Sequence, residues 1–328
     1  MTLTLRRNEP VAEDAALPGM IGEHPSMKDV YRLVRRVAPT DLPVLIVGET
    51  GTGKELVARA IHELSDRLLH PFVAVNAAAI PESLFESELF GHERGAFSDA
   101  RAEKPGLLQV ANKGSFFCDE VTALPSACQA KLLRAMEEGC VRRLGGLRPR
   151  PAAPRWVAAC QRTDGLREDL RHRLTGVVVR LPPLRERASD IPALAWHFLA
   201  RLDHGALDLG PDAMSLLASH IWPGNVRELR MAVCRAVVLR RDSVIDEAAI
   251  ELALGDGAPS RAGGRDCSAA SLQQVLLDHG GDTTAAARAL GIARSTFYER
   301  LRRVGLAPPR RRNSGSVGIA TGTKPESE

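Results

Sequence analysis

The chain has 328 residues, of which 44% are apolar and 26% charged, and it carries a formal net charge of +4 at pH 7. This size and apolar content are typical of an ordinary soluble protein with two or three folded domains. Because no run approaches the roughly 18 consecutive apolar residues of a membrane span, and the start lacks an apolar signal segment, we expect a cytoplasmic protein with no membrane partner.

The cysteines indicate reduced structural thiols rather than a metal centre. They lack the close-paired spacing of a zinc site, and most lie in apolar or helical stretches. We therefore predict neither zinc nor disulfide bonds for Cys118, Cys128, Cys140, Cys160, Cys234 and Cys267.

From residue 19 to about residue 181, the chain alternates strand-like and helix-like patterns. Five short runs are rich in β-branched or aromatic residues, and amphipathic stretches separate them. The runs are 44–47, 72–75, 115–118, 156–159 and 177–181. Such alternation is typical of a parallel α/β sheet.

A glycine-rich turn, here called the phosphate loop, joins the first strand to a helix. It reads Gly48, Glu49, Thr50, Gly51, Thr52, Gly53, Lys54 and Glu55. Glycines let backbone N–H groups point at phosphate oxygens, the helix start adds a positive dipole end, and Lys54 reaches the β- and γ-phosphates. The loop predicts binding of a nucleoside triphosphate; the alternative is a glycine-rich turn with an accidental lysine. Since Glu55 replaces the hydroxyl residue that usually meets Mg²⁺, the ion must depend on other ligands.

Two acidic residues, Asp119 and Glu120, follow the strand run 115–118. The carboxyl ends of parallel strands share one edge of a sheet, so both side chains are expected beside the phosphate loop. We predict that Asp119 holds Mg²⁺, mostly through water, and that Glu120 polarises the water that attacks the phosphate. The alternative is a pair of exposed loop acids.

The chain changes character after residue 181. Helical periodicity over 190–202, 211–220 and 226–240 replaces the strand patterns, and a glycine-rich stretch follows at 255–264. The predicted segments are a short extension (1–18), an α/β nucleotide-binding part (19–181), a helical lid (182–254), a flexible linker (255–267), a helix-turn-helix domain (268–308) and a disordered tail (309–328).

Residues 282–305 read as a helix, a glycine turn and a second helix, the pattern of a helix-turn-helix. Its inner apolar positions are Ala286, Leu290, Ile292, Phe297 and Leu301. The side chains expected on base edges are Arg294, Ser295, Thr296, Tyr298 and Arg300, with Arg302 and Arg303 on phosphates. Seven arginines against one acid between residues 294 and 312 support double-stranded DNA as the partner. A plain helical hairpin is the alternative.

Residues 19–254 resemble the AAA+ domain of bacterial enhancer-binding proteins, the ATP-driven activators of sigma-54 RNA polymerase. The phosphate loop carries the resemblance, with Val-Asn-Ala-Ala at 75–78 and Glu-Ser-Glu-Leu-Phe-Gly-His-Glu at 86–93, and the C-terminal part is similar to the family's Fis-type unit. The resemblance makes Glu55 a family trait. It implies an AAA+ parallel sheet with a helical lid, ATP and Mg²⁺ as ligands, a homo-oligomeric ring such as a hexamer, and DNA-binding units that dimerise through Leu272, Val275 and Leu276.

The same resemblance assigns roles to four further residues of the α/β part. Asn76 is expected to hydrogen-bond Glu120 and relay the nucleotide state, and Gln161 to reach the γ-phosphate or its water. Arg167 and Arg173 are expected to act as fingers on the γ-phosphate of the neighbouring subunit. The alternative for Asn76 is an ordinary turn asparagine at the end of a strand. The alternative for Arg167 and Arg173 is a solvent-exposed, arginine-rich helix face.

Two sensor segments complete the comparison with the family. The connection after Gln161 is several residues shorter than usual, and Cys160-Gln161 replaces a typical Thr-Asn, so we expect slow hydrolysis. Residues 221–229 are similar to the second sensor, in which Asn225 caps a helix and Arg227 touches the nucleotide from the lid. A surface arginine is the alternative for Arg227.

The loop that touches the sigma factor departs from the family pattern Gly-Ala-Phe-Thr-Gly-Ala. Here it reads Gly95, Ala96, Phe97, Ser98, Asp99 and Ala100. Asp99 adds a negative charge and penalises any positive φ that the loop tip requires, while Ser98 keeps the hydroxyl of threonine without its methyl group. These changes argue against direct engagement of sigma-54.

The combined pattern predicts a DNA-binding transcriptional regulator whose AAA+ ring hydrolyses ATP and remodels sigma-54 closed complexes. The rival is a sigma-54-independent regulator, or a subunit of a mixed ring, that uses ATP mainly for assembly. A free-standing metabolic ATPase is disfavoured by the DNA-binding pattern. With so few residues before position 19, we expect no sensory domain within the chain, and control by expression level, a partner protein or nucleotide supply.

Overall fold

The structure is a computed structural model that describes residues 14–203, 207–240, 242–255, 275–279 and 282–289, together with Phe297 and Leu301. Contacts divide the chain into two compact units, residues 1–259 and residues 260–328. Among the described helices, none is both long and apolar enough to cross a bilayer.

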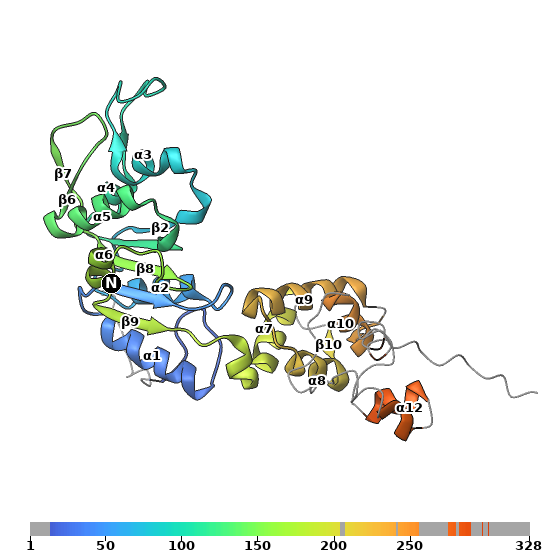
Figure 1. Cartoon of the computed structure of the whole chain (residues 1–328). Coiled ribbons are helices and arrows are strands. Elements are labelled where there is room, and N and C mark those ends of the chain that lie inside the picture. Colours follow the sequence, from blue (N-terminus) through green and yellow to red (C-terminus); the bar gives the residue numbers. More distant parts are fainter. Residues whose placement is uncertain are drawn as a thin grey trace, which may run out of the picture. The chain divides into compact units, whose positions relative to one another are not determined.

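A five-stranded parallel sheet forms the centre of the first unit, in the order β2-β5-β8-β1-β9 (Figure 1). The strands are β1 (Val44–Val47), β2 (Phe72–Asn76), β5 (Ser115–Asp119), β8 (Arg155–Cys160) and β9 (Val177–Arg180). All five predicted strands form, because buried parallel strands read as continuous runs of β-branched and aromatic residues. The predicted α/β class is confirmed.

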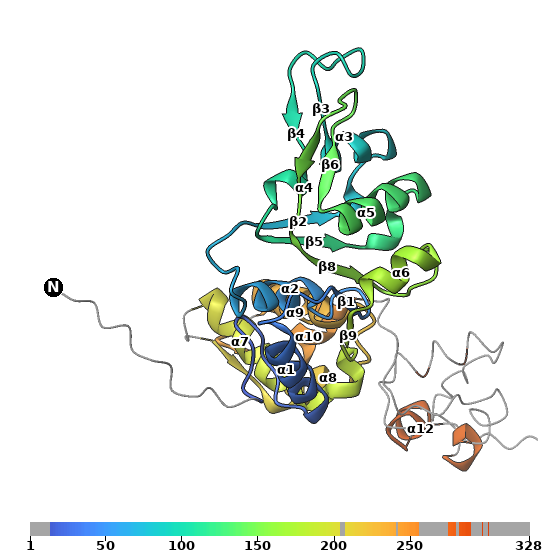
Figure 2. The same cartoon turned by 90° about the vertical axis from the view of Figure 1, so that its left-hand side faces the viewer.

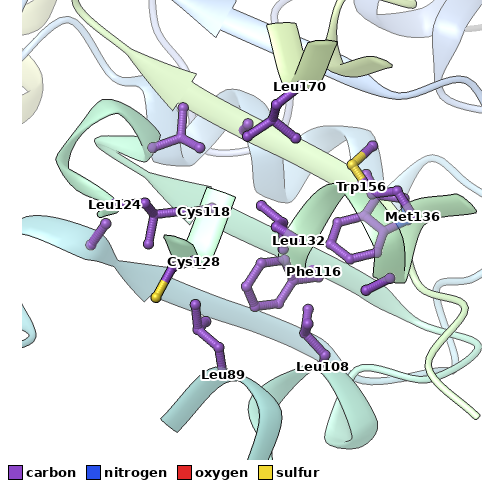
Figure 3. Packing of buried hydrophobic residues seen from close by; sticks show 14 of the residues in the cluster. Leu89, Leu108, Phe116, Cys118, Leu124, Cys128, Leu132, Met136, Trp156 and Leu170 are labelled. Carbon is purple, nitrogen blue, oxygen red and sulfur yellow. The ribbon is translucent and has the colours of Figure 1, made fainter. Parts of the chain in front are cut away.

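Helices cover both faces of this sheet, because side chains alternate between its faces along each strand. On one face, α1 (Pro25–Val37) and α2 (Lys54–Glu63) pack over Ile46 and Phe117. On the other face, Phe116 and Trp156 meet edge to face at 5.7 Å within the cluster of Figure 3. The helices on that face are α3 (Phe85–Phe90), α4 (Leu107–Val110), α5 (Ser126–Glu138) and α6 (Glu168–Leu174).

Two hairpins project together from the end of the sheet where α3 and α4 lie (Figures 1 and 2). Their loops touch, since Arg143 of the second donates to Glu103 of the first at 2.8 Å. The hairpins are β3 (Gly91–His92) with β4 (Lys104–Pro105), and β6 (Cys140–Arg142) with β7 (Pro149–Pro151). Short helices η1 (Ala77–Ala79), η2 (Glu82–Leu84) and η3 (Val121–Ala123) complete this part.

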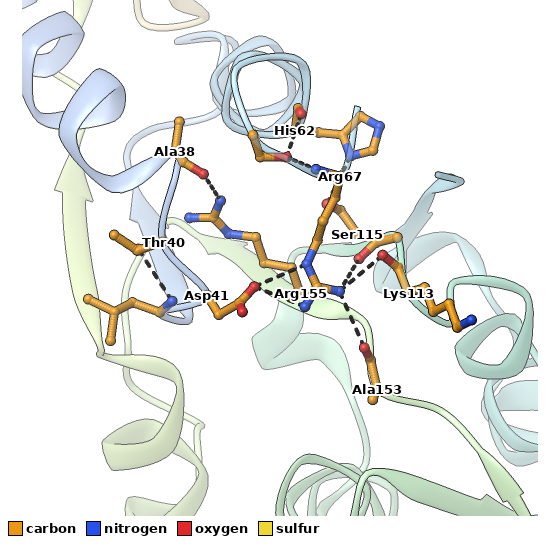
Figure 4. Close-up of polar contacts among 12 residues, drawn as sticks. Ala38, Thr40, Asp41, His62, Arg67, Lys113, Ser115, Ala153 and Arg155 are labelled. Atoms are coloured by element: carbon orange, nitrogen blue, oxygen red, sulfur yellow. Dashed lines mark hydrogen bonds and ion pairs between the residues drawn. The ribbon is translucent and has the colours of Figure 1, made fainter. Parts of the chain in front are cut away.

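Buried arginine links the amino ends of the strands to the end of α1 (Figure 4). Arg155 is 1% exposed, and its guanidinium donates to the backbone oxygens of Val37 and Ala38 at the end of the helix. The Val37 oxygen also accepts from Thr40, whereas Arg155 supplies the bond to the Ala38 oxygen. Burial lowers the pKa of Arg155 to about 10, so it stays charged at neutral pH. Arg67 adds bonds to the backbone oxygens of Lys113, Gly114 and Ala153 and pairs with Asp41.

Arg155→Met is therefore expected to reduce the free energy of unfolding by about 2 kcal/mol, because it leaves the Ala38 carbonyl without a donor and removes a charged donor from the Val37 carbonyl. Urea denaturation followed by circular dichroism measures the loss. The control is Arg32→Met, which removes an exposed ion pair to Asp29 on α1 and should change stability by less than about 0.5 kcal/mol. Equal losses in the two variants would contradict the role given to Arg155.

The lid is a separate helical layer with its own core around Trp222. Its helices are η4 (Leu184–Asp190), α7 (Ile191–Asp203), α8 (Pro211–Ser219), α9 (Asn225–Leu239) and α10 (Glu247–Leu254), with short strands β10 (Asp208–Leu209) and β11 (Val244–Ile245). The three helices predicted from periodicity form within one residue of their expected ends. Sequence analysis missed α10, whose eight residues follow an Asp246 side chain that accepts from the N–H of Ala249.

In the second unit, the described residues include α12 (Thr283–Ala289). The Asp282 carboxylate accepts from the N–H of Thr284 at 2.7 Å and so caps this helix. Ala286, Phe297 and Leu301 are buried together, as the helix-turn-helix pattern predicts. Leu290 and Ile292, the expected linker beyond Gly255 and the expected tail lie outside the described residues.

Five cysteines fall among the described residues, namely Cys118, Cys128, Cys140, Cys160 and Cys234, and all carry free thiols. Burial raises the pKa of Cys118 to about 12 and that of Cys160 to about 11, so both stay protonated at neutral pH. Within the same residues, no group of three or more His, Cys, Asp and Glu side chains could hold a metal ion.

Candidate active site

The carboxyl ends of all five strands of the sheet meet around the phosphate loop. β1 runs directly into the loop, and the register places Val47 between Cys160 of β8 and Arg180 of β9. On the far side, Asn76 at the end of β2 lies opposite Asp119 at the end of β5. This edge of a parallel sheet is the usual place for a ligand.

Lys54 is the centre of the site, and only 5% of its surface is exposed. Its Nζ atom donates to the Gly48 backbone oxygen at 3.1 Å and to Glu120 Oε1 at 3.2 Å. The turn that places it depends on glycine, because Gly51 and Gly53 have φ values of 80° and 106°. A buried ammonium group thus lies between the loop and the carboxylate that was predicted to activate water.

Glu120 adopts a left-handed backbone conformation, with φ 50° and ψ 48°. Among the described residues, three other non-glycine residues have positive φ: Lys113, Trp222 and Asn225. This conformation costs roughly 1 kcal/mol or more for a residue with a Cβ, so surrounding contacts must hold it. Here the Glu120 N–H donates to Asp119 Oδ1 at 3.0 Å and the carboxylate accepts from Lys54.

Asp119 has an environment suited to a bound cation. Burial raises the pKa of its carboxyl group, the charge of Lys54 opposes that rise, and the charge of Glu120 adds to it. A buried carboxylate with a second carboxylate beside it is stabilised by added positive charge, and carboxylate oxygens are the donors that Mg²⁺ prefers. The described residues form no cage of side chains for a metal, but Asp119 fits the prediction of a Mg²⁺ ion held mostly through water.

Asn76 does not make the bond expected of it. Its side-chain oxygen accepts from the N–H of Ala78 at 2.9 Å, which starts η1, and no hydrogen bond joins it to Glu120, although the structure describes both residues. Asparagine often accepts from the backbone N–H two residues on, and this bond engages Oδ1, while the side-chain amide that would donate to a carboxylate makes no bond to Glu120. Gln161 does turn to the phosphate loop, where its Nε2 donates to Thr50 Oγ1 at 2.6 Å.

The two predicted finger residues lie at opposite ends of α6. Arg167 precedes the helix and its guanidinium pairs with Asp169 through bonds of 2.8 and 3.1 Å, which raises the pKa of Arg167 and lowers that of Asp169. Arg173 is exposed in the last turn of α6. Within the described part of this single chain, neither side chain contacts Lys54.

The lid holds the phosphate loop through Asn225, which is fully buried. Its Nδ2 atom donates to the Thr50 backbone oxygen at 3.0 Å and to Glu49 Oε2 at 3.1 Å, while its Oδ1 accepts from the N–H of Leu184 at 2.8 Å. The prediction that Asn225 caps α9 is wrong. Gly224 precedes the helix without a side-chain cap, and Asn225 is its first residue, with φ 54°.

Arg227 is exposed beside the loop, as its place in the first turn of α9 requires. It lines a half-open hollow of about 240 Å³ with Thr50, Met231 and Leu254. The backbone of the loop is equally close to the lid, since a methyl group at Gly51 would lie 2.2 Å from the Gly224 backbone oxygen.

Two lid residues that sequence analysis missed also contact the loop. Arg185 makes a two-bonded ion pair with Glu49, at 2.7 and 2.9 Å, and the buried Arg187 donates to the Thr52 backbone oxygen at 3.1 Å. Their only sequence signal is an Arg-Glu-Arg triplet just after the last strand of the sheet, a pattern that is common on protein surfaces.

The loop at residues 95–100 closes on itself through a bond from the Gly95 N–H to the Ala100 oxygen of 2.8 Å. Phe97 is 41% exposed and packs edge-on against His92. Ser98 and Asp99 are exposed, and Asp99 is not among the residues with positive φ. The expected backbone penalty at Asp99 is therefore absent from this conformation, and its difference from a glycine lies in the exposed, charged side chain.

The residues predicted to contact DNA lie outside the described residues. They are Arg294, Ser295, Thr296, Tyr298, Arg300, Arg302 and Arg303.

Comparisons with known proteins place these features in one family. The sigma-54 interaction domain matches residues 20–180, an AAA+ ATPase lid domain matches residues 185–266, and the bacterial regulatory protein, Fis family, matches residues 265–303. The transcriptional regulatory protein ZraR of Klebsiella oxytoca is 42% identical over 90% of this chain and 71% of its own length. The chain belongs to the bacterial enhancer-binding proteins.

Other enhancer-binding regulators match over a similar extent. The nitric oxide reductase transcription regulator NorR2 of Cupriavidus necator is 41% identical over 92% of this chain, which spans 66% of the length of NorR2. The crystal structure of NtrX from Brucella abortus in complex with ATP superposes with a TM-score of 0.65 at 32% identity, covering 90% of this chain and 70% of NtrX. The AAA+ sheet, the lid and the C-terminal helix-turn-helix unit expected from the sequence are thus confirmed as the fold.

Proposed function

We propose that this enhancer-binding protein binds ATP with Mg²⁺ at the phosphate loop, hydrolyses it, and uses the hydrolysis to remodel sigma-54 RNA polymerase at promoters whose upstream DNA it binds. The observation that carries the proposal is the contact of the buried Lys54 with Glu120, which is held in a left-handed conformation at the end of β5. Strained backbone at a strand end beside a phosphate loop is typical of a catalytic group.

The chain's own residues divide the chemistry of phosphoryl transfer between them. Backbone N–H groups of the phosphate loop and the start of α2 bind the phosphates, and Lys54 adds a point charge. Glu120 orients the attacking water and accepts its proton. When bound, Mg²⁺ would neutralise charge on the β- and γ-phosphates, and Asp119 is the carboxylate that would hold it.

Assembly and DNA binding complete the proposed activity. Arg167 and Arg173 on the surface of α6 would serve the nucleotide of a neighbouring copy, which makes hydrolysis depend on a homo-oligomeric ring, for which a hexamer is the expected size. The Fis-type unit would bind duplex DNA as a dimer. A variant that lacks the finger arginines or the Fis-type unit would lose transcriptional activation but still bind the nucleotide.

The experiment that tests the proposal is ATP-dependent open-complex formation by the purified chain on a sigma-54 promoter with its upstream site. A known activator with the same sigma-54 holoenzyme is the positive control. Open complexes that require ATP support the proposal. Silence, with ATP and DNA binding both demonstrated, would favour the sigma-54-independent or mixed-ring regulator.

The same assay tests the loop at residues 95–100. Asp99→Gly is expected to increase open-complex formation about three-fold, because removing an exposed charge changes binding free energy by less than about 1 kcal/mol. Asp99→Asn should match it, since φ at Asp99 does not require glycine. A large gain with Gly but none with Asn would show that backbone freedom, and not charge, limits the loop.

A further inference from the structure

The short helix η4 contacts both sides of the nucleotide-binding edge. Arg185 pairs with Glu49 and Arg187 donates to the Thr52 oxygen, so two of its side chains contact the phosphate loop. Asp190 at its other end accepts from the N–H groups of Glu23 and His24 at 2.8 and 3.0 Å, in the segment before α1. Because η4 leads directly into α7, these contacts connect the loop to the first helix of the lid.

Glu49 presents a charge problem for a loop that binds phosphate. A carboxylate near a triphosphate repels it, and the repulsion is strong where water is partly excluded. Three hydrogen bonds fix the Glu49 side chain. Both its oxygens accept from Arg185, and Oε2 also accepts from the buried Asn225. These bonds lower the pKa of Glu49, so it is fully ionised at neutral pH.

Two other acids at the loop, Glu120 and Glu55, have cations of their own. Glu120 contacts Lys54, and Glu55 pairs with Arg59 at 2.9 Å on the surface of α2. Arg185 is the cation that the structure provides for Glu49, through two parallel bonds that fix its orientation. An isolated surface ion pair contributes little to the stability of the fold. We therefore look for the role of this pair in ligand binding by the phosphate loop.

We propose that Arg185 is the counter-ion of Glu49: it cancels the carboxylate's charge so that the phosphate loop accepts a nucleoside triphosphate, and it ties that acceptance to the lid. Arg185 is thus a positioning residue and not a catalytic one. The inference rests on the proposed function, since it requires that the loop binds ATP. It predicts a larger effect on ATP than on ADP, because ATP carries more negative charge.

The test compares full-length wild type, Arg185→Ala, Glu49→Gln and the double variant, by isothermal titration with ATP and with ADP at fixed salt. Arg185→Ala is expected to weaken ATP binding about ten-fold and ADP binding about three-fold. Adding Glu49→Gln should restore ATP affinity to within about three-fold of wild type, because the uncompensated charge is gone. A residue with a merely structural role would not be rescued by removing its partner.

Arg32→Ala is the matched control, since it removes an arginine of similar exposure, 44% against 45%, whose partner Asp29 lies on α1 and not in the phosphate loop. It should leave ATP affinity within about two-fold of wild type. An equal loss in Arg32→Ala, or a double variant that binds ATP no better than Arg185→Ala, would overturn the inference. If Arg185→Ala does not fold, Arg185→Gln with and without Glu49→Gln gives the same comparison. Failure of the wild type to bind ATP would instead refute the proposed function.

Discussion

Replacing Glu120 with glutamine is expected to reduce the rate of ATP hydrolysis by about 100-fold or more while ATP affinity stays within about three-fold of wild type. The amide keeps the size of the side chain and can still contact Lys54, but it cannot accept a proton from water. Hydrolysis is measured as released phosphate, and affinity by titration with ATP. The left-handed backbone at Glu120 is unchanged by this substitution, so the fold should persist.

Glu63→Gln provides the matched control for this variant. Glu63 ends α2 and is exposed, so its substitution removes the same charge from the surface without touching the site. Its hydrolysis rate should equal that of wild type. Hydrolysis retained within ten-fold in Glu120→Gln would assign activation of water to another group, and the exposed-acid alternative for this strand end would then be preferred.

Replacing Arg173 with alanine is expected to reduce hydrolysis about 1,000-fold, because a guanidinium supplied to the neighbouring γ-phosphate stabilises transition-state charge. Its exposed position in the last turn of α6, away from Lys54 of its own chain, is what a residue acting between copies requires. Nucleotide affinity should change far less than the rate.

Mixing the two inactive variants distinguishes action between subunits from action within one. In a mixed ring, an Arg173→Ala subunit keeps Glu120 and can receive Arg173 from a neighbouring Glu120→Gln subunit, so equimolar mixtures should regain a measurable fraction of wild-type hydrolysis. The control is a double variant that carries both Glu120→Gln and Arg173→Ala in one chain. Mixtures of this double variant with either single variant should stay inactive. Absence of recovery, with ring assembly demonstrated by light scattering, would place the action of Arg173 within its own subunit.

The predicted loop penalty at Asp99 illustrates how a local rule depends on conformation. From the sequence, an aspartate in place of glycine was expected to strain the loop tip, yet the described loop turns at Gly95, with φ 80°, and leaves Asp99 in an ordinary conformation. In this conformation Asp99 changes the charge of the loop without straining its backbone. An electrostatic effect on sigma-54 engagement would depend on salt concentration.

The sequence by itself determined the features whose physics is local. The five strands, the phosphate loop and the acids at the end of β5 follow from runs of apolar residues, glycines in a turn and a helix start, all within about ten residues of chain. The inner apolar positions of the helix-turn-helix that the structure describes are also fixed by helical spacing. Each of these patterns is read without knowing which segments meet.

Only the tertiary structure decided which distant residues share the site. It decided the order of the strands. It also decided the pairing of Arg185 with Glu49, the bond from Asn225 to Thr50 and the bonds of Arg155 to the end of α1, which join residues more than 100 positions apart. A charged or amide side chain could hydrogen-bond equally well to many groups, and nearby sequence does not favour one of them. The packing of the lid against the sheet decides which partner it meets. Asn76 shows the converse, since its side-chain oxygen bonds only two residues away and its amide makes no bond to Glu120.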